Sequence, residues 1–209
     1  MNVIHAIIEG MIRNIGGGLG VRLRSAYYRN KFASCGKELR IDVGVIIEGA
    51  KFIHLGDQIW IDKNCILMAG EVQLPDSNQK VFPNNLYSKN EGELHIGSQS
   101  HLAPNTIIQA YGGVEIGSNF TASADCKIYS LSNDPKKCKL GTYGSQDIHY
   151  VKSNIVIGKN VWLGLNTIVL GGTIEDDVFV GPNSVVIQSL PSKAFAQGNP
   201  ATKIKDRFQ

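Results

Sequence analysis

The sequence predicts an all-β solenoid, in which short parallel strands wind into a β-helix. Two observations predict this fold. From about residue 41, an aliphatic residue, often followed by Gly, Ala or Asp, recurs every six residues. The fifth position of each unit is usually small or β-branched. Alternation alone cannot separate a solenoid from a β-sandwich, but a fixed period sustained over at least four coils favours the solenoid.

Each coil of such a solenoid consists of three six-residue units, and stacked coils bury a continuous core. We therefore expect the aliphatic positions to point inward. They include Leu55, Ile61, Ile96, Leu102, Ile108, Ile116, Ile128, Ile157, Leu163, Val169, Ile174, Val180 and Val186. The small positions are Cys65, Ser100, Thr106, Cys126, Val161, Thr167, Val178 and Ser184.

The repeat sets the domain boundaries. We assign residues 35–209 to the β-helix domain and residues 191–209, within it, to a closing segment. Residues 72–93 and 133–153 lack the repeat and are rich in Asn, Asp, Pro, Lys and Ser, so we expect two loops ejected from the coil. Long loops on a rigid scaffold often carry function.

Residues 1–34 form a separate helical, basic segment. Apolar residues at helical spacing predict an amphipathic helix over residues 3–15, which we expect Gly16-Gly17-Gly18 to end. Residues 21–33 predict a second, basic helix. These helices could cap the open end of the β-helix, or residues 1–33 could contact a membrane surface; the sequence leaves both open.

The length of 209 residues fits one domain. The sequence shows neither a membrane span nor a secretory signal pattern. The four cysteines show no disulfide or CxxC spacing, so we expect a cytoplasmic protein. Residues 1–40 contain seven of the 21 basic residues but two of the 18 acidic ones. This basic region indicates either attraction to an anionic lipid or substrate, or a solvated helix face; we expect no nucleic-acid partner.

Three segments resemble the hexapeptide-repeat acyltransferases, and in particular the sugar O-acetyltransferases of lipopolysaccharide, capsule and galactoside type. They are residues 155–164 (IVIGKNVWLG), 180–186 (VGPNSVV) and 197–204 (QGNPATKI), and the resemblance covers about residues 35–207. It implies a left-handed β-helix and a homotrimer with acetyl-CoA bound between subunits. The implied function is acetyl transfer to a sugar hydroxyl, in cell-surface polysaccharide biosynthesis.

One column of corner residues is the candidate acceptor site. Trp60, His101, Thr121, Trp162 and Phe179 each end the first unit of a coil, so we expect them to stack along one edge. The resemblance assigns Trp162 to the acceptor site, which places His101 on the same wall. Histidine suits a general base because its pKa lies near working pH. A solvated corner histidine with a local hydrogen bond is the alternative.

The position where the family's usual catalytic histidine would stand holds Asn133. An amide accepts a hydrogen bond but takes no proton at neutral pH, so Asn133 can only help to bind the acceptor. His101 and His149 remain as candidate bases, and we favour His101 because it lies on a rigid corner. Two alternatives remain: the protein could catalyse the reaction by positioning the substrates without a base, or it could be a β-helix protein without catalytic activity.

The resemblance also assigns the donor site. Leu165 and Pro182 would line the acetyl-CoA channel through their backbones, and the turn Gly164-Leu165-Asn166 could hold the oxyanion with its N–H groups. Gln188 and Lys205 fall where the family contacts the distal end of the donor. Lys205 could pair with a phosphate or could be a solvated lysine.

Two further functions share this fold. An N-acetyltransferase acting on a nucleotide-linked amino sugar would use the same donor. A zinc enzyme with three histidine ligands is disfavoured, because His95 and His101 are six residues apart and should point away from each other on adjacent faces. We therefore expect no close histidine pair and no metal.

Overall fold

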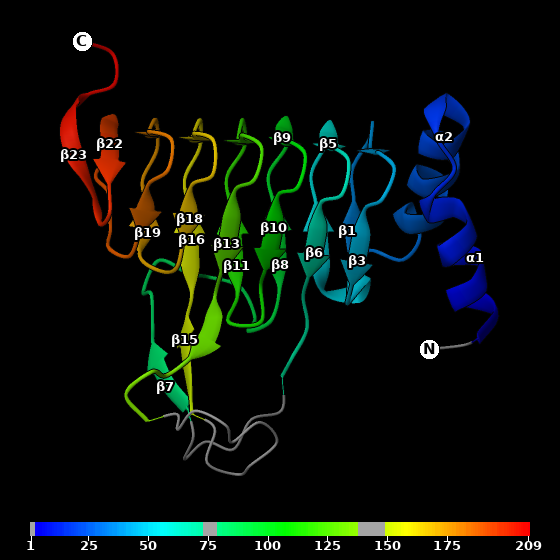
Figure 1. Ribbon diagram of the computed structural model, residues 1–209, viewed down its shortest axis with the longest axis horizontal. Helices are drawn as coiled ribbons and strands as arrows, with labels where there is room; N and C mark the ends of the chain where they lie inside the picture. The colour runs from blue at the N-terminus through cyan, green and yellow to red at the C-terminus, as the bar shows by residue number, and fades with distance from the viewer. Residues whose placement is uncertain (1–2, 73–78, 138–148) are drawn as a thin grey trace.

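The computed structural model describes residues 3–72, 79–137 and 149–209, and it has the shape of a three-faced prism (Figure 1). Each face is a sheet of short strands, one from each coil, and the strands within a face pair in parallel apart from the last two strands of the second face. The predicted all-β solenoid is confirmed.

The three faces take their strands in rotation along the chain. The first face contains β1 (Ser34–Cys35), β4 (Ile53–Leu55), β8 (Leu94–Ile96), β11 (Val114–Ile116), β16 (Ile155–Ile157) and β19 (Thr173–Ile174). The second face contains β2 (Arg40–Ile41), β5 (Ile59–Ile61), β9 (Ser100–Leu102), β12 (Thr121–Ala122), β17 (Trp162–Leu163), β20 (Phe179–Val180), β22 (Ala194–Gly198) and β23 (Ala201–Asp206). The third face contains β3 (Ile46–Glu48), β6 (Ile66–Met68), β10 (Ile107–Gln109), β13 (Lys127–Tyr129), β18 (Ile168–Val169) and β21 (Val185–Val186).

The core lies inside the prism. Every aliphatic position that the period assigned to the interior is buried, and so is every small fifth position, including the polar Ser100, Thr106, Thr167 and Ser184. Their hydroxyls donate to backbone carbonyls of the corner three residues earlier, as Thr167 Oγ1 does to Gly164 O at 2.8 Å. These bonds satisfy buried hydroxyls that an apolar core would otherwise leave unpaired.

The corners depend on residues that accept a left-handed backbone. Asn105, Asp125, Asn166 and Asn183 all have positive φ, and they follow one another along one edge. Asparagine and aspartate tolerate this conformation better than most residues. Their side chains also bond from coil to coil: Asn166 Nδ2 donates to Asn183 Oδ1 at 3.0 Å.

The segments predicted as loops over 72–93 and 133–153 do leave the coil, but they are not loops throughout, because parts of them form a small sheet of their own. It contains β14 (Leu131–Asn133), β15 (Tyr150–Ser153) and β7 (Gln79–Phe82), in the order β14-β15-β7, and it projects from one edge of the prism (Figure 1). The pairing joins segments about 70 residues apart, as in Lys80 with Val151. A search for a six-residue period does not detect such a pairing.

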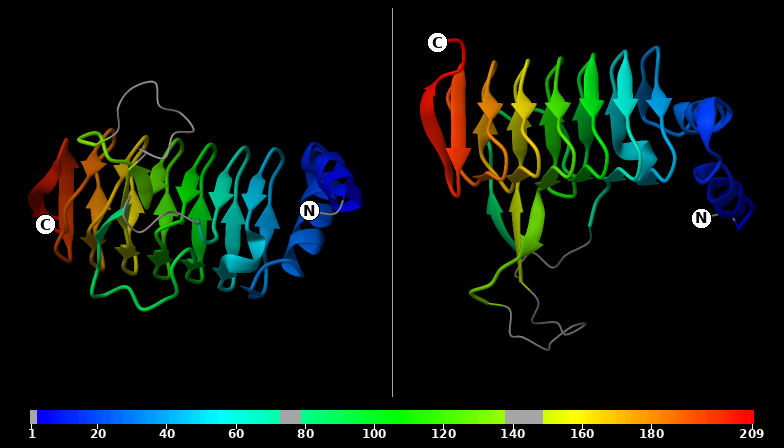
Figure 2. Two further views of the ribbon diagram at one scale, coloured as in Figure 1. Left: turned by 90° about the horizontal axis from the view of Figure 1, so that it is seen from below. Right: turned by 45° about the horizontal axis from the view of Figure 1, so that its top comes forward.

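The chain between β7 and β8 then runs along the outside of the first face (Figure 2). Asn84 Nδ2 donates to Thr173 Oγ1 at 2.8 Å on β19. Ser88 Oγ donates to Glu115 on β11. Residues 83–92 therefore cover much of this face, from the C-terminal coils back to β8.

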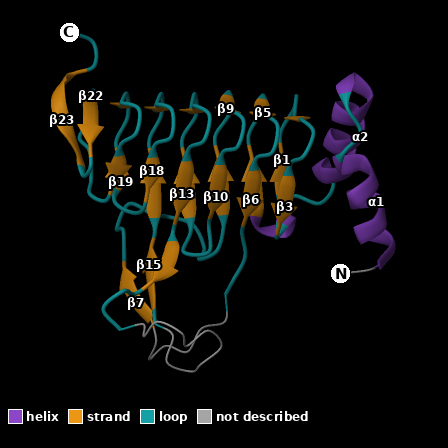
Figure 3. Cartoon of the chain, in the orientation of Figure 1, coloured by secondary structure: helices purple, strands orange, loops and turns teal. Residues whose placement is uncertain are grey.

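Two helices and a short 3-10 turn complete the described chain (Figure 3). They are α1 (Val3–Arg13), α2 (Gly17–Arg29) and η1 (Ala50–Phe52). The sequence placed the second helix at 21–33, but it begins at Gly17. The glycine triplet ends only the first helix: Gly16 is the N-cap of the second, and Gly17, with a φ of 67°, makes the turn in one residue.

A buried arginine joins the helices to the first coil. Arg24 on α2 is fully buried, and its Nη1 donates to Ile12 O at 2.8 Å and to Ile15 O at 2.7 Å, where α1 ends. Its Nε donates to Ile41 O on β2 at 3.1 Å. The guanidinium thus satisfies carbonyls that a helix end leaves unpaired, and it holds α2 over the open end of the prism. The opposite end is closed by the antiparallel pair β22 and β23.

Neither helix among the described residues has the length and apolar character of a membrane span.

Candidate functional site

The predicted corner column exists, and it is longer than the sequence indicated. Parallel pairing on the second face aligns one outward residue from each strand in turn. We call this set the outer column. It consists of Arg40, Trp60, His101, Thr121, Trp162, Phe179 and Phe195.

The outer column is largely aromatic and has a cation at each end. The Trp162 and Phe179 ring centroids are 5.0 Å apart, and those of Phe179 and Phe195 are 5.2 Å apart. The Arg40 guanidinium lies 4.4 Å from the Trp60 ring centroid, and Lys205 Nζ lies 5.6 Å from that of Phe195. Flat aromatic faces with a charge beside them suit a ligand that has both apolar and anionic parts.

His101 is held by a carboxylate. Its Nε2 lies 2.9 Å from Asp62 Oδ2, and its ring stands 5.0 Å from the Trp60 centroid. Asp62 follows β5, one coil before His101. When Nε2–H donates to Asp62, the lone pair is on Nδ1, and the side chain is 37% exposed, so this nitrogen is available to a ligand. The sequence identified His101 but not its Asp62 partner.

Trp162 lies two coils beyond His101, with Thr121 between them. Its indole Nε1–H donates to Ser123 Oγ at 2.8 Å, which fixes the ring on the surface. The side chain remains 46% exposed. An anchored but exposed indole presents a rigid flat face to solvent, as a binding surface requires.

The predicted donor-site residues occupy the next corner of the same coils. Leu165 is exposed, and its carbonyl accepts from Asn183 N at 2.9 Å, so its turn stacks on the turn that holds Pro182. Gly164 N and Asn166 N already donate to neighbouring coils, to Val180 O of the next coil and Ala124 O of the preceding one. They are therefore engaged, which leaves the Leu165 N–H as the candidate of this turn for the predicted oxyanion role.

The two distal residues predicted to contact the donor are exposed and separate from each other. Gln188 follows β21 on the third face, where its Nε2 donates to Ala201 O at 3.4 Å. Lys205 lies on β23 of the second face, above Phe195.

Asn133 and His149 do not lie beside the outer column of the same chain. Asn133 pairs with Tyr150 in the projecting sheet, and Asp134 N donates to His149 O at 2.8 Å, so the two candidates adjoin each other. Figure 1 shows this sheet at the edge of the prism away from β5 and β9. Asn133 and His149 therefore adjoin each other but are separated from His101 and Trp162 of the same chain, because the segment leaves the coil after the third face.

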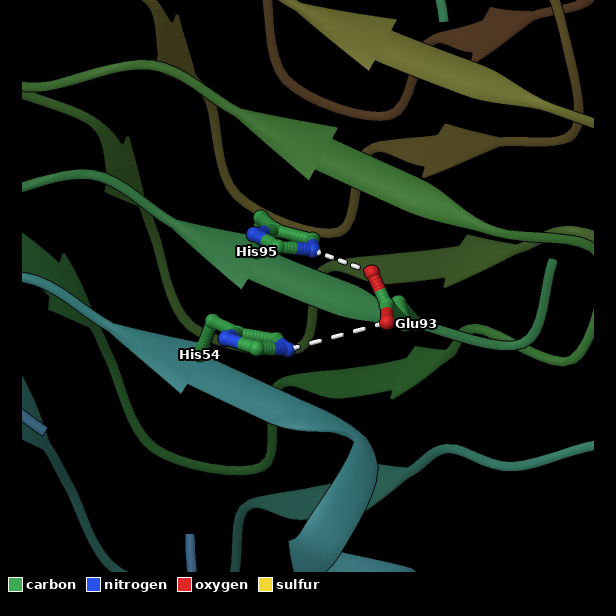
Figure 4. A group of neighbouring side chains, drawn as sticks. All are labelled: His54, Glu93 and His95. Carbon is green, nitrogen blue, oxygen red and sulfur yellow. Dashed lines mark hydrogen bonds and ion pairs between the residues drawn. The ribbon is translucent and has the colours of Figure 1, made fainter. Parts of the chain in front are cut away.

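A second cluster was missed. His54 on β4 and His95 on β8 occupy the same register, and their rings stack with centroids 4.1 Å apart and an interplanar angle of 3° (Figure 4). His95 Nε2 lies 2.7 Å from Glu93 Oε2, and His54 Nε2 lies 3.8 Å from Glu93 Oε1. The expectation of no close histidine pair was therefore wrong.

The cause of that error is the ejected segment. His95 and His101 are neighbours along one coil, whereas His54, the partner of His95, lies one coil away. Forty-one positions separate His54 from His95, and the inserted residues between them hide the equivalence of their places in the repeat. Subtracting residues 72–93 from that separation leaves about one coil, which would have indicated that the two histidines are neighbours.

The electrostatics of this cluster are defined by burial and hydrogen bonds. Burial, together with the adjacent His95, lowers the pKa of His54. Burial would raise the pKa of Glu93, but hydrogen bonds from Asn90 and His95 outweigh it and lower this pKa to about 2. Both shifts act in the same direction at neutral pH: they favour an ionised Glu93 carboxylate and an uncharged His54 imidazole.

No protein-family model matches the chain. Individual relatives do. WcaF of Escherichia coli (strain K12), named for acetyl transfer in colanic acid biosynthesis, is 29% identical over 118 residues, which are 56% of this chain and 60% of WcaF. WbbJ of the same organism, named for O-acetyl transfer in lipopolysaccharide biosynthesis, is 52% identical over 54 residues, which are 25% of this chain and 28% of WbbJ. The match thus spans less than two thirds of each curated relative.

Solved structures show the same architecture. A mutant of AntD, an N-acyltransferase from Bacillus cereus, in complex with dTDP and coenzyme A, is 25% identical, with a TM-score of 0.70 over 88% of this chain and 89% of that one. The chain is therefore a left-handed parallel β-helix of hexapeptide repeats, and the relatives that share its fold and its sequence are named as acyltransferases, WcaF and WbbJ as acetyltransferases.

Proposed function

We propose that this chain transfers an acetyl group from acetyl-CoA to a saccharide hydroxyl in cell-surface polysaccharide biosynthesis. The observation that carries the proposal is the outer column, where the His101–Asp62 pair stands among exposed aromatic rings. Its relatives WcaF and WbbJ are named for acetyl transfer in the synthesis of surface polysaccharides.

The column supplies the groups that acyl transfer needs. His101 Nδ1 would accept the acceptor hydroxyl proton as that oxygen bonds to the thioester carbon, and Asp62 would hold the ring and stabilise its charge. The Leu165 N–H would donate to the negative carbonyl oxygen. As the carbon–sulfur bond breaks, His101 would return the proton to the sulfur. A base of this kind contributes roughly 10²–10⁴-fold in rate.

The proposed donor site extends from Leu165 and Pro182 toward Gln188 and Lys205. The exposed corner of stacked turns offers backbone carbonyls and N–H groups to an extended chain, and Lys205 offers a cation for a phosphate. Trp162, between this corner and His101, would orient the sugar.

We propose further that the active unit is a homotrimer. One chain keeps the outer column and the Asn133–His149 region apart, so a second copy would bring its projecting sheet to the column. The third face supports this, because its outward residues Ile46, Ile66, Ile107, Ile168 and Val185 form an aliphatic column interrupted only by Lys127. A cyclic trimer repeats one such heterologous contact and closes.

Ile107→Asp tests that arrangement, because a carboxylate would be buried within the proposed contact. Light scattering at micromolar concentration should give a trimer for the natural chain and a smaller species for the variant, with lost acetyl transfer. A natural chain that is monomeric and fully active would contradict the shared site.

The N-terminal helices carry a proposed membrane contact. Ile7, Met11, Leu19 and Leu23 are exposed apolar residues on α1 and α2, within the basic first 40 residues. Such a surface suits anionic lipid headgroups, and the free thiols among the described residues suit a cytoplasmic location. Sedimentation with anionic but not with neutral vesicles would support the contact, and no sedimentation with either would oppose it.

One observation favours a second function. The AntD structure contains dTDP, and a diphosphate would suit the cation Arg40 at one end of the outer column. The alternative is thus N-acetylation of a nucleotide-linked amino sugar.

Release of the coenzyme A thiol, measured with matched hydroxyl-bearing and amine-bearing saccharides, separates the functions. O-acetylation predicts turnover with the hydroxyl acceptors and a base-labile ester in the product. Turnover with amines alone would transfer the assignment to N-acetylation. An intact trimer that turns over with neither class would mean a non-catalytic β-helix protein.

Matched variants locate the base. His101→Ala should lower kcat by roughly 10²–10⁴-fold with coenzyme A affinity unchanged, and Asp62→Asn should lower kcat less. His149→Ala should cost little. Loss of turnover in His149→Ala alone would move the role of base to the projecting sheet.

A further inference from the structure

We propose that His54, Glu93 and His95 bind a divalent transition-metal ion such as Zn²⁺, at a site on the first face that is separate from the outer column. The three side chains come from two successive coils and the end of the segment that crosses this face. Nothing in the acetyl-transfer proposal uses them.

The geometry converges on one point. One ligand atom from each residue lies within 4.8 Å of the other two, and both Nε2 atoms face the Glu93 carboxylate (Figure 4). An ion bonded to imidazole nitrogen and carboxylate oxygen at about 2.0–2.2 Å would draw these atoms together. All three side chains are half-buried, and we infer that tilting of the two rings about their side-chain bonds would bring the nitrogens to the ion.

The neighbouring groups orient the ligands as metal sites require. His54 Nδ1 lies 3.1 Å from Ser34 Oγ, so a proton on Nδ1 directs the Nε2 lone pair toward Glu93. Asn90 Nδ2 donates to Glu93 Oε1 at 2.7 Å, which fixes the carboxylate. Outer hydrogen bonds of this kind set the tautomer and direction of ligating groups.

The stacked imidazoles offer two nitrogen ligands to one ion. Their rings are parallel with centroids 4.1 Å apart, and both Nε2 atoms lie on the side of the Glu93 carboxylate. One divalent ion bonded to both nitrogens and to the carboxylate would use all three groups at once. Two histidines and one glutamate are a ligand set that zinc enzymes use, with water in the fourth position.

The surroundings leave that fourth position open. A surface hollow of about 290 Å³ is lined by Ser34, His54, His95 and Glu115, among others, and reaches the cluster. Lys89, a cation on the crossing segment near the cluster, is 3.5 Å from Glu115 Oε1, which offsets its charge. The proposed ion would therefore tie the crossing segment to β4 and β8 while it retains a site for water or a small anion.

Titration of the full-length chain, without an affinity tag and first stripped with a chelator, tests the proposal. Cobalt(II) absorption and zinc content by mass spectrometry should both give one equivalent per chain. At a hundredfold excess over the dissociation constant, zinc should raise Tm by about 5–10 °C. The visible cobalt bands report nitrogen and oxygen ligation directly.

The variants decide where the ion binds. His54→Ala and His95→Ala should each abolish the stoichiometric binding, and Glu93→Gln should weaken it at least tenfold. His101→Ala is the matched control, because it removes another histidine paired with a carboxylate and should keep one equivalent. Saturation that persists in His54→Ala and His95→Ala, or no stoichiometric binding by the natural chain, would overturn the proposal. Circular dichroism identifies a variant that fails to fold, and Glu93→Gln, nearly isosteric, then decides.

Discussion

Replacing Arg24 with methionine tests how the N-terminal helices are attached to the β-helix. Methionine keeps an apolar stem but loses the guanidinium, which donates to Ile12 O, Ile15 O and Ile41 O within 3.1 Å. Each bond from a charged donor contributes about 1.5–3 kcal/mol, so three contribute roughly 5–9 kcal/mol. Methionine avoids the cost of burying a charge, which offsets about half of this. We expect a net loss of about 3 kcal/mol.

For a chain of this size, that loss lowers Tm by about 6–12 °C. Thermal unfolding followed by far-ultraviolet circular dichroism measures the shift, and hydrogen exchange should show faster exchange in α1 and α2 than in the coils. Arg22→Met is the matched control, because Arg22 is an exposed arginine on the same helix and should lose under about 0.5 kcal/mol. Equal Tm values for the two variants would refute the role given to Arg24.

The other predictions concern the helix contact, the core and the buried thiols. A Cβ on Gly20 would lie 1.8 Å from Ile15 O, so Gly20→Ala should cost about 1–3 kcal/mol in urea unfolding; an unchanged midpoint would contradict this close approach. Leu102→Ala should cost about 2–5 kcal/mol in the same assay, because its side chain is fully buried, and a loss under about 1 kcal/mol would contradict its place in the core. Burial raises the pKa of Cys65 to about 12 and of Cys126 to about 11. At pH 8 both thiols should resist iodoacetamide until the chain unfolds, as peptide mass spectrometry would show, and rapid labelling of the folded chain would oppose their burial.

The solenoid could be predicted because its information is local and repeated. Each coil shows the same spacing of aliphatic and small residues, so the inward positions and the alignment of His101, Thr121 and Trp162 in one column follow from counting. The first helix followed in the same way from apolar spacing, and the second was expected as a basic helix. Their junction did not, because Gly17 turns the chain in a single residue and the second helix then starts at once.

The features that the sequence did not predict depend on contacts between residues on either side of the inserted segments. The sheet of β7, β14 and β15, the His54–His95 stack and the Asp62–His101 pair each join residues from different coils or ejected segments. No short-range pattern encodes these pairings. The burial of Arg24 was hidden for a related reason: a basic helix reads as solvated unless the carbonyls that surround it are known.

The measurement that tests the central claim most directly is a crystal structure of the protein with coenzyme A and a saccharide acceptor. The proposal predicts the thiol at the corner of Leu165 and Pro182, with the acceptor hydroxyl about 2.6–3.2 Å from His101 Nδ1 and the sugar against Trp162. It also predicts that a second copy of the chain completes the site with its projecting sheet. A thiol beside His149, with His101 and Trp162 of every copy in contact with solvent alone, would contradict the assignment.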